Sequence, residues 1–244
     1  MNQTICQFSF SLSAWNIVCD KVLSKEDWLR EPEDWWQHEF TDFAPKLAFL
    51  PPLKRRRLNL SARLFFEAAW NLLEEDANIP VIYASLNGEV NRNFQLWHSL
   101  LTENELSPTS FSLSVHNALV GQWSEFRGVT AETEAITANG DNLEIALLEA
   151  YLLLNEGHRK VLVICGESPL EQQYNATPVE RFPFNYSLAL LIEQGHDYQL
   201  TLSTQPHTKT KINSSLEWVR MHYSDSHQWT TRSSNGETWK WCKK

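Results

Sequence analysis

Apolar residues recur along this chain at two spacings, which together predict helices alternating with strands. Spacings of three and four residues predict helices over 59–76, 91–101, 111–126 and 141–155. Alternating or continuous apolar runs predict strands over 5–12, 80–85, 135–137, 160–165, 187–193 and 198–203. Elements in this order predict an α/β domain with a mostly parallel sheet.

The helix predicted over 141–155 has the most continuous apolar stripe. A stripe of this width between two apolar strands predicts that Ala146 and Ala150 are buried. Asp141 and Glu144 have the spacing of a capping box at its start.

No linker and no internal repeat divides the 244 residues, so a single domain over 1–244 is expected. The tail after about residue 204 is polar and aromatic. It holds several tryptophans, and its pattern predicts neither a helix nor a strand.

Charge and hydropathy exclude several classes of function. The net charge of −9 disfavours general nucleic-acid binding, which depends on neutralising phosphates. The apolar runs are too short for a membrane span, and the first residues do not resemble a secretory signal. A cytoplasmic protein is therefore expected.

One basic run interrupts this acidic composition, and two interpretations of it stay open. In the first it is a solvated lead-in to the next helix; in the second it is a docking patch for an acidic partner such as an acyl carrier protein. The run consists of Lys54, Arg55, Arg56 and Arg57.

The residues capable of metal, redox or nucleophilic chemistry are scattered. The four cysteines form no CxxC pair, so neither a metal nor a cofactor is predicted, and Cys165 is expected to be a core residue. His116 is expected to be a hydrogen-bonded structural histidine, with Asn117 tying backbone groups of the same helix. Gly88 and Gly121 are expected where backbones approach closely.

Several segments together resemble one known family. RRRLNLS (55–61), VIYASLNGEVNRN (81–93), LSPTSFSLSVHNALVGQWS (106–124), the turn at 135–140 and VLVICGESPLEQQY (161–174) are similar to the N-terminal domain of β-ketoacyl synthase-like proteins. This family belongs to the thiolase-like superfamily, and similar members from aryl polyene and related gene clusters are described as ketosynthase chain length factors.

The resemblance implies an α/β fold that corresponds to the N-terminal half of a thiolase-like ketosynthase, with helices on both faces of the sheet. It also implies that the catalytic nucleophile is missing. In the family the turn before the central helix carries the active-site cysteine, and here Asn139 or Gly140 stands in that place. The family's catalytic histidines belong to a C-terminal half that this chain lacks. The resemblance therefore implies a non-catalytic subunit that pairs with a full-length ketosynthase and meets an acyl carrier protein only indirectly.

The same resemblance implies which residues meet the partner. The expected interface and tunnel residues are Phe111, Leu113, Val115, His116 and Asn117. Phe111 has two interpretations, a gate at the end of the partner's acyl tunnel or an ordinary core residue. For the whole chain two alternatives stay open: a scaffold that only stabilises its partner, and a small acyltransferase or hydrolase using His98, His116 or Cys165.

Overall fold

A computed structural model describes residues 3–174, 179, 181–208 and 213–244. Seven strands form one sheet in the order β3-β2-β4-β5-β7-β6, with β1 also paired to β5. The strands are β1 (Thr4–Cys19), β2 (Val81–Ala84), β3 (Thr133–Ile136), β4 (Lys160–Glu167), β5 (Tyr186–Pro206), β6 (Gln228–Arg232) and β7 (Glu237–Lys243). The helices are α1 (Lys25–Trp28), η1 (Asp34–Trp36), α2 (Pro52–Arg55), α3 (Leu60–Ala69), η2 (Trp70–Leu72), α4 (Val90–Glu103), α5 (Pro108–Ser112), α6 (Ala118–Arg127), α7 (Asn142–Asn155) and α8 (Ser214–Tyr223).

The α/β architecture is confirmed, but the expectation of a mostly parallel sheet is wrong. Only β3, β2 and β4 are mutually parallel, and every pairing of β1, β5, β6 and β7 is antiparallel. Parallel neighbours need a crossover, usually a helix. Helical crossovers join β2 to β3 and β3 to β4, whereas β6 and β7 form a hairpin.

β5 is one long strand where the sequence predicts two. Its middle contains Gly195, which interrupts the apolar pattern. Opposite this point the register of β1 against β5 shifts between Phe10 and Ser11, so several residues of β5 bulge. A Cβ at position 195 would collide with the side chain of Ser11. The close approach of β5 to β1 at this point therefore requires a glycine.

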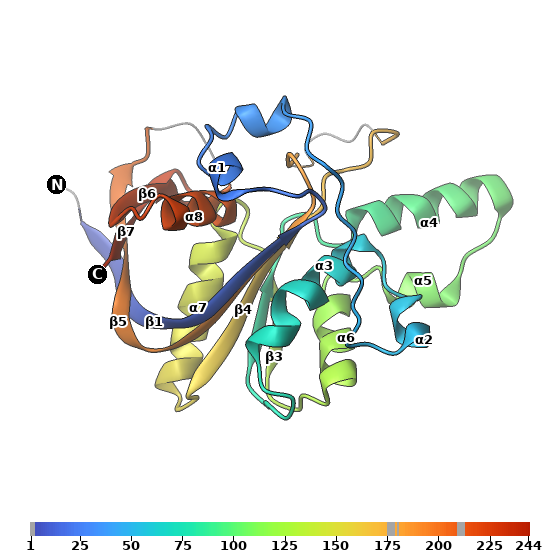
Figure 1. The fold of residues 1–244 in the computed structure, drawn as a ribbon, viewed down its shortest axis with the longest axis horizontal. Helices are drawn as coiled ribbons and strands as arrows, with labels where there is room; N and C mark the ends of the chain where they lie inside the picture. Colours follow the sequence, from blue (N-terminus) through green and yellow to red (C-terminus); the bar gives the residue numbers. More distant parts are fainter. Residues whose placement is uncertain (1–2, 175–178, 180, 209–212) are drawn as a thin grey trace.

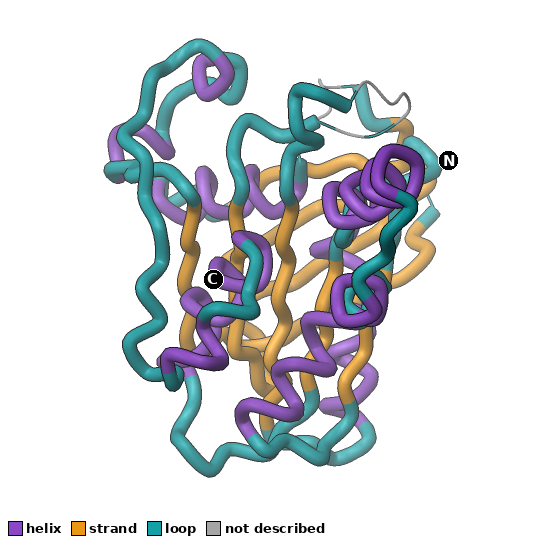
Figure 2. Tube along the Cα trace, turned by 90° about the vertical axis from the view of Figure 1, so that its right-hand side faces the viewer, coloured by secondary structure: helices purple, strands orange, loops and turns teal. Residues whose placement is uncertain are grey.

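Helices cover both faces of the sheet and define two apolar clusters. α7 and α8 pack in one cluster with the tryptophans of β6 and β7, while α3 and α6 pack in the other. Figure 1 shows α7 on one side of the sheet and α3 and α6 on the opposite side. Viewed from the side of α4, helices lie in front of the strands (Figure 2). Ala146 and Ala150 are fully buried, as predicted.

The helix predicted over 111–126 is two helices. α5 ends at Ser112 and α6 begins at Ala118, with a non-helical link between them. Serine hydroxyls compete for backbone carbonyls at this break, since Ser112 donates to Pro108 O (2.9 Å) and Ser114 to Phe111 O (2.8 Å). The break separates the residues that the sequence assigns to one interface helix.

The C-terminal tail, for which the sequence predicts neither helix nor strand, completes the sheet. Its hairpin, β6–β7, pairs with β5 and buries Trp229, Trp239 and Trp241 against α7 and α8. Among the described residues, no helix has the length and apolar content to cross a membrane.

Candidate functional site at the β3–α7 turn

The turn that the family resemblance assigns to the nucleophile lies between the carboxyl end of β3 and the start of α7. This is the strand–turn–helix order that the sequence predicts. Asn139 adopts a left-handed backbone (φ 39°), and its side chain is exposed. The turn is tied at its base, because Asn142 Oδ1 accepts from the amide of Ala138 at 2.5 Å. Ala138, Asn139, Gly140 and Asp141 thus form a strand–turn–helix corner without a thiol or hydroxyl group.

The β6–β7 hairpin closes over this corner. The hydroxyl of Ser234 accepts from the amide of Gly140 (3.1 Å) and is placed to donate to the carbonyl of Ala138 (2.8 Å) or to the carboxylate of Asp141. The same carboxylate accepts from Ser234 N (3.1 Å) and from Trp239 Nε1 (2.8 Å). A segment more than ninety residues away in sequence therefore fills the hydrogen-bonding positions around the turn.

These contacts correct the expected capping box. Asp141 does precede α7, but its side chain makes no capping bond to the helix. Glu144 is fully buried and accepts from Trp241 Nε1 (3.1 Å) and from the hydroxyl of Thr231. Both carboxylates therefore accept from indole and hydroxyl donors of the hairpin, although the second carboxylate oxygen of Glu144 is buried without a partner among the described residues.

Burial also alters the acidity of Glu144. Desolvation is the largest cause and raises the pKa of its carboxyl to about 7, while the Thr231 bond acts in the opposite direction. The uncharged form of this carboxyl group is therefore favoured to a higher pH than in an exposed glutamate.

A second buried acid, Glu167, lies at the carboxyl end of β4. It accepts from the amides of Leu86 (2.6 Å) and Asn87 (3.1 Å) and from the side chains of Ser85 (3.2 Å) and Asn142 (3.3 Å). Desolvation raises its pKa to about 7 against these bonds. Glu167 thereby connects the ends of β2 and β4 with the start of α7.

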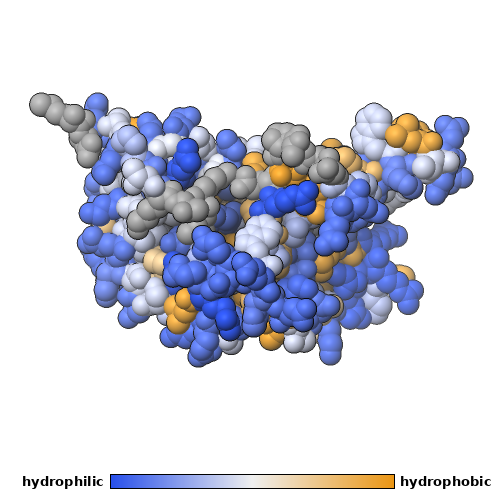
Figure 3. All heavy atoms as spheres, turned by 90° about the horizontal axis from the view of Figure 1, so that it is seen from above, coloured by the Kyte–Doolittle hydropathy of each residue, from blue (hydrophilic) through white to orange (hydrophobic). Residues whose placement is uncertain are grey.

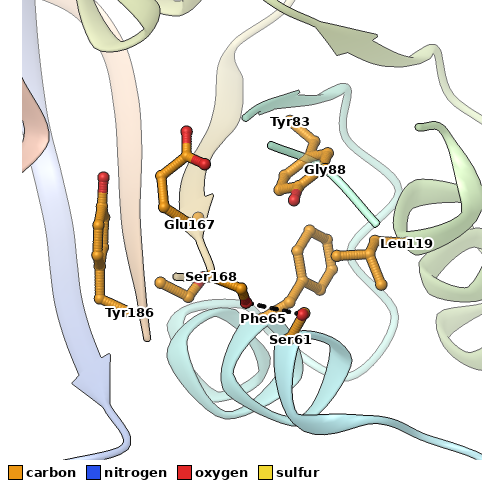
Figure 4. Close-up of a pocket in the computed structure, with 10 residues that line it drawn as sticks. Ser61, Phe65, Tyr83, Gly88, Leu119, Glu167, Ser168 and Tyr186 are labelled. Carbon is orange, nitrogen blue, oxygen red and sulfur yellow. Dashed lines mark hydrogen bonds between the residues drawn. The ribbon is translucent and has the colours of Figure 1, made fainter. Parts of the chain in front are cut away.

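The cavity beside Glu167 is too small for a substrate. Figure 4 shows Glu167 and Tyr186 facing Tyr83 and Phe65 across it, with the Ser61–Ser168 hydrogen bond (2.9 Å) closing one side. Its volume of about 10 Å³ corresponds to one water molecule. An acyl chain finds no room in this part of the chain.

His116 is a hydrogen-bonded histidine, as predicted. Its Nε2 lies 2.9 Å from the carbonyl oxygen of Ser85, at the end of β2. Gly88, in the left-handed region (φ +51°), makes room for the ring, because a Cβ there would lie 2.8 Å from the imidazole. The expectation of closely approaching backbones is wrong for both glycines, because the neighbour of Gly88 is a side chain and nothing lies within 4 Å of the position that a Cβ at Gly121 would take.

Phe111 lies on a protruding surface, which we call the α4–α5 arm (residues 90–112). Its side chain is 59% exposed, which rules out the core interpretation for the isolated chain. An apolar cradle of about 200 Å³ lies in the arm, lined by Asn93, Leu96, Trp97, Leu100, Leu106 and Phe111. Apolar side chains gather over the end of the arm in Figure 3.

Leu113 belongs to a different surface, which we call the basic groove. This groove of about 390 Å³ is lined by Leu53, Lys54, Arg57, Thr109, Ser112, Leu113, Gln122, Glu125 and Phe126. Lys54 lies over the ring of Phe126 (4.3 Å), and Arg57 is exposed. Arg56 is also exposed, whereas Arg55 donates to the carbonyl of Lys46 (3.2 Å). The basic run thus supplies two cations to a surface that also includes Leu113.

The other predicted interface residues lie in the link before α6. Val115 is half exposed and available to a partner. Asn117 precedes α6 but makes no side-chain capping bond, so the expectation that it ties backbone groups of this helix is wrong.

The residues proposed for an alternative enzyme lie on different elements. Cys165 is buried in the central strand β4, and desolvation raises the pKa of its thiol well above the usual range. His98 is exposed on α4, while His116 is bonded to Ser85 O. Among the described residues, no group of three or more histidine, cysteine or acidic side chains could hold a metal ion.

Sequence reasoning missed the residues that close the corner. Ser234, Thr231, Trp239 and Trp241 lie in the tail, where the alternation of TWKWC over 238–242 was a usable strand signal. The burial of Glu144 and Glu167 had no sequence signal, because the donors that satisfy each of them come from distant segments.

The comparisons with known proteins agree with this architecture. A family model for the β-ketoacyl synthase N-terminal domain matches residues 26–242, and the chain belongs to this family. A comparison with curated proteins finds no match.

Solved structures share the fold at low sequence identity. A chain of the ketosynthase (ApeO) in complex with its chain length factor (ApeC) from Xenorhabdus doucetiae is 23% identical, with a TM-score of 0.78 over 97% of this chain and 100% of that chain. A chain of AntDE:AntF, a type II polyketide acyl carrier protein with its ketosynthase, is 10% identical, with a TM-score of 0.66 over 100% of both chains. A chain of the ishigamide ketosynthase/chain length factor is 12% identical, with a TM-score of 0.58 over 79% of this chain and 66% of that chain.

Proposed function

We propose that this chain is a non-catalytic ketosynthase-like subunit, a chain length factor. It pairs with a full-length β-ketoacyl carrier-protein synthase and shapes that partner's acyl tunnel. The pathway class is aryl polyene, polyketide or fatty-acid-like biosynthesis. One observation carries the proposal: β3, a tight turn and α7 follow one another as strand, turn and helix, and the turn, where the family resemblance places the nucleophile at Asn139 or Gly140, contains no thiol or hydroxyl group.

Chemistry explains why this observation matters. Condensation on a ketosynthase requires a thiolate, and a helix N-terminus lowers a thiol's pKa. Here the corner offers amide, methyl and carboxylate groups, and Ser234 already accepts from the amide of Gly140. Such a corner can fix the start of α7, but it cannot carry an acyl thioester.

The pairing proposal is supported by two kinds of observation. Structures of similar fold include a ketosynthase in complex with its chain length factor and a second ketosynthase/chain length factor pair. The chain itself exposes an apolar arm and ends its sheet at β3, whose outer edge has no strand neighbour among the described residues. An open edge and an apolar arm are surfaces that a partner would cover.

The cradle is the better of two candidate tunnel ends. Leu96, Trp97 and Leu100 surround Phe111 with apolar surface that suits the end of an acyl chain. Leu113 instead shares its groove with Lys54 and Arg57, which suits the acidic surface of a carrier protein. We therefore assign chain-length control to the cradle and carrier-protein contact to the basic groove.

The scaffold and small-enzyme alternatives lead to different results in one experiment. The isolated chain, the ketosynthase and their mixture are each incubated with acyl and malonyl carrier proteins. Mass spectrometry of the intact proteins and of the products is the readout. We expect no covalent acyl group on this chain and condensation only when the ketosynthase is present.

An acyl adduct on the isolated chain would overturn the proposal in favour of the small enzyme. A change in product length when this chain joins the ketosynthase would distinguish a chain length factor from a scaffold, which would change yield alone.

A further inference from the structure

The outer edge of β3 lies beside a half-exposed apolar strip. Ile136 of β3 and Ile145 and Leu148 of α7 are partly buried against the same apolar cluster, and Leu152 of α7 is 47% exposed. β3 pairs with β2 on its inner side only. A strand of another protein can therefore add to this edge and cover the strip at the same time.

The charged groups around this edge have one dominant sign. Three acids act electrostatically on Glu134, and the four together form what we call the acidic rim: Glu132, Glu134, Glu149 and Glu156. Partial desolvation raises the pKa of Glu134 first, and the negative charges of Glu149, Glu132 and Glu156 raise it further. Basic side chains also lie near: His158 contacts Glu132 (3.0 Å), Arg159 is exposed next to the start of β4, and Lys160 is already paired with Glu193 (3.8 Å).

In a symmetric pair of identical chains, the negative charge at this edge would oppose association. Two copies that joined their β3 edges about a two-fold axis would each bring the same surface to the contact. Each copy's acids would then face the other copy's acids, and like charges opposed across paired strands are destabilising. A different protein with basic side chains beside its edge strand would instead neutralise them.

We propose that the acidic rim of the β3 edge prevents this chain from pairing with itself and selects a partner whose edge strand is flanked by lysine or arginine. This inference rests on the proposed function, since it names the chemistry of the ketosynthase surface. The partner strand adds antiparallel to β3, and its apolar side chains cover Leu148 and Leu152.

The test uses only this chain, so it needs no identified partner. Wild type, the Glu134→Lys/Glu149→Lys variant and a 1:1 mixture are compared by sedimentation equilibrium at low salt. At positions 134 and 149, wild type alone brings acids together and the variant alone brings lysines together, whereas the mixture brings opposite charges together at these two positions. We expect association in the mixture to be at least about tenfold tighter than in either protein alone.

A matched control removes the effect of total charge. Glu26 and Glu39 are exposed acids on a distant segment, and Glu26→Lys/Glu39→Lys changes the net charge by the same amount. Its mixture with wild type should stay monomeric. Slower amide exchange at 133–136 in the first mixture would place the contact at β3.

Three outcomes would overturn the inference: a wild-type dimer through β3 at low salt, a mixture that stays monomeric, or a control mixture that associates equally well. None of these bears on the proposed function. That proposal fails separately, if the chain binds no ketosynthase and changes no product.

Discussion

At the scale of single residues, Phe111 and Leu113 show how two neighbouring positions acquire different surroundings. The sequence places both on one predicted interface helix. The structure ends α5 at Ser112, so Phe111 faces the apolar cradle and Leu113 faces the basic groove. Under the proposed function, the two side chains would separate chain-length control from carrier-protein contact.

Phe111→Ala should lengthen the products of the reconstituted pair, because it opens the apolar cradle by about one aromatic ring. Since the side chain is 59% exposed, we expect a loss of stability below about 1 kcal/mol, not the 3–5 kcal/mol of a core phenylalanine. Product profiling and a denaturation curve are the measurements. Leu113→Ala is the control, which should leave product length unchanged; the reverse pattern would reject the cradle as the tunnel end.

Glu144 should make the folded chain less stable as pH rises toward neutrality. The folded carboxyl holds its proton up to about pH 7, whereas the unfolded one releases it near 4.5. Between these values the folded state binds more protons, so the free energy of unfolding falls as pH increases. This one group should remove roughly 2–4 kcal/mol across the interval.

Denaturant unfolding at pH 5 and pH 8 measures this effect. Glu144→Gln keeps the oxygen that accepts from Trp241 and cannot ionise, so its decline in stability between the two pH values should be smaller than in wild type. Equal declines in both proteins would show that Glu144 titrates normally.

At the scale of elements, the β6–β7 hairpin holds the start of α7 through specific polar contacts. Trp239 Nε1 donates to the buried carboxylate of Asp141, whereas Trp229 Nε1 is buried with no hydrogen-bond partner among the described residues. Both tryptophans lie in the same hairpin and the same apolar cluster. They therefore form a matched pair for measuring the hydrogen bond.

Trp239→Phe should destabilise the chain by about 1–3 kcal/mol, because it leaves a buried carboxylate oxygen unsatisfied. Trp229→Phe removes a comparable ring area but no hydrogen bond. The measured quantity is the free energy of unfolding in urea, and a Trp229 variant that loses as much as the Trp239 variant would contradict a specific role for the bond.

Helices and strands were predictable from the sequence where the apolar pattern of the segment itself was sufficient to identify them. The apolar stripe of α7 gave its bounds to within a residue, and the helix predicted from residue 59 begins at Leu60, where the structure shows Asn59 accepting from the amide of Ala62 (3.0 Å). The hairpin was missed because its tryptophans are buried by α7 and α8, which lie elsewhere in the sequence. Parallel pairing was overestimated because the sequence does not show which strands meet without a crossover.

At the scale of the whole molecule, charge is distributed unevenly. The chain has a net charge of −9, yet the basic groove presents Lys54 and Arg57 beside exposed Arg56. The acids at the β3 edge and the cations of this groove would attract different partners. The proposed complex with a ketosynthase and a carrier protein would use such a division, since two partners cannot cover the same surface.

Lys54→Glu/Arg57→Glu should weaken the use of carrier protein by the reconstituted pair without altering its assembly. Opposing charges between the groove and an acidic carrier protein accelerate their encounter, and this attraction is screened by salt. We expect the carrier-protein concentration for half-maximal rate to rise about tenfold at low salt, and the difference from wild type to shrink at high salt. Lys25→Glu/Lys240→Glu changes two exposed lysines elsewhere and is the charge-matched control. If both variants lose activity equally, total charge explains the effect; if neither does, the basic run is only the solvated lead-in to α3.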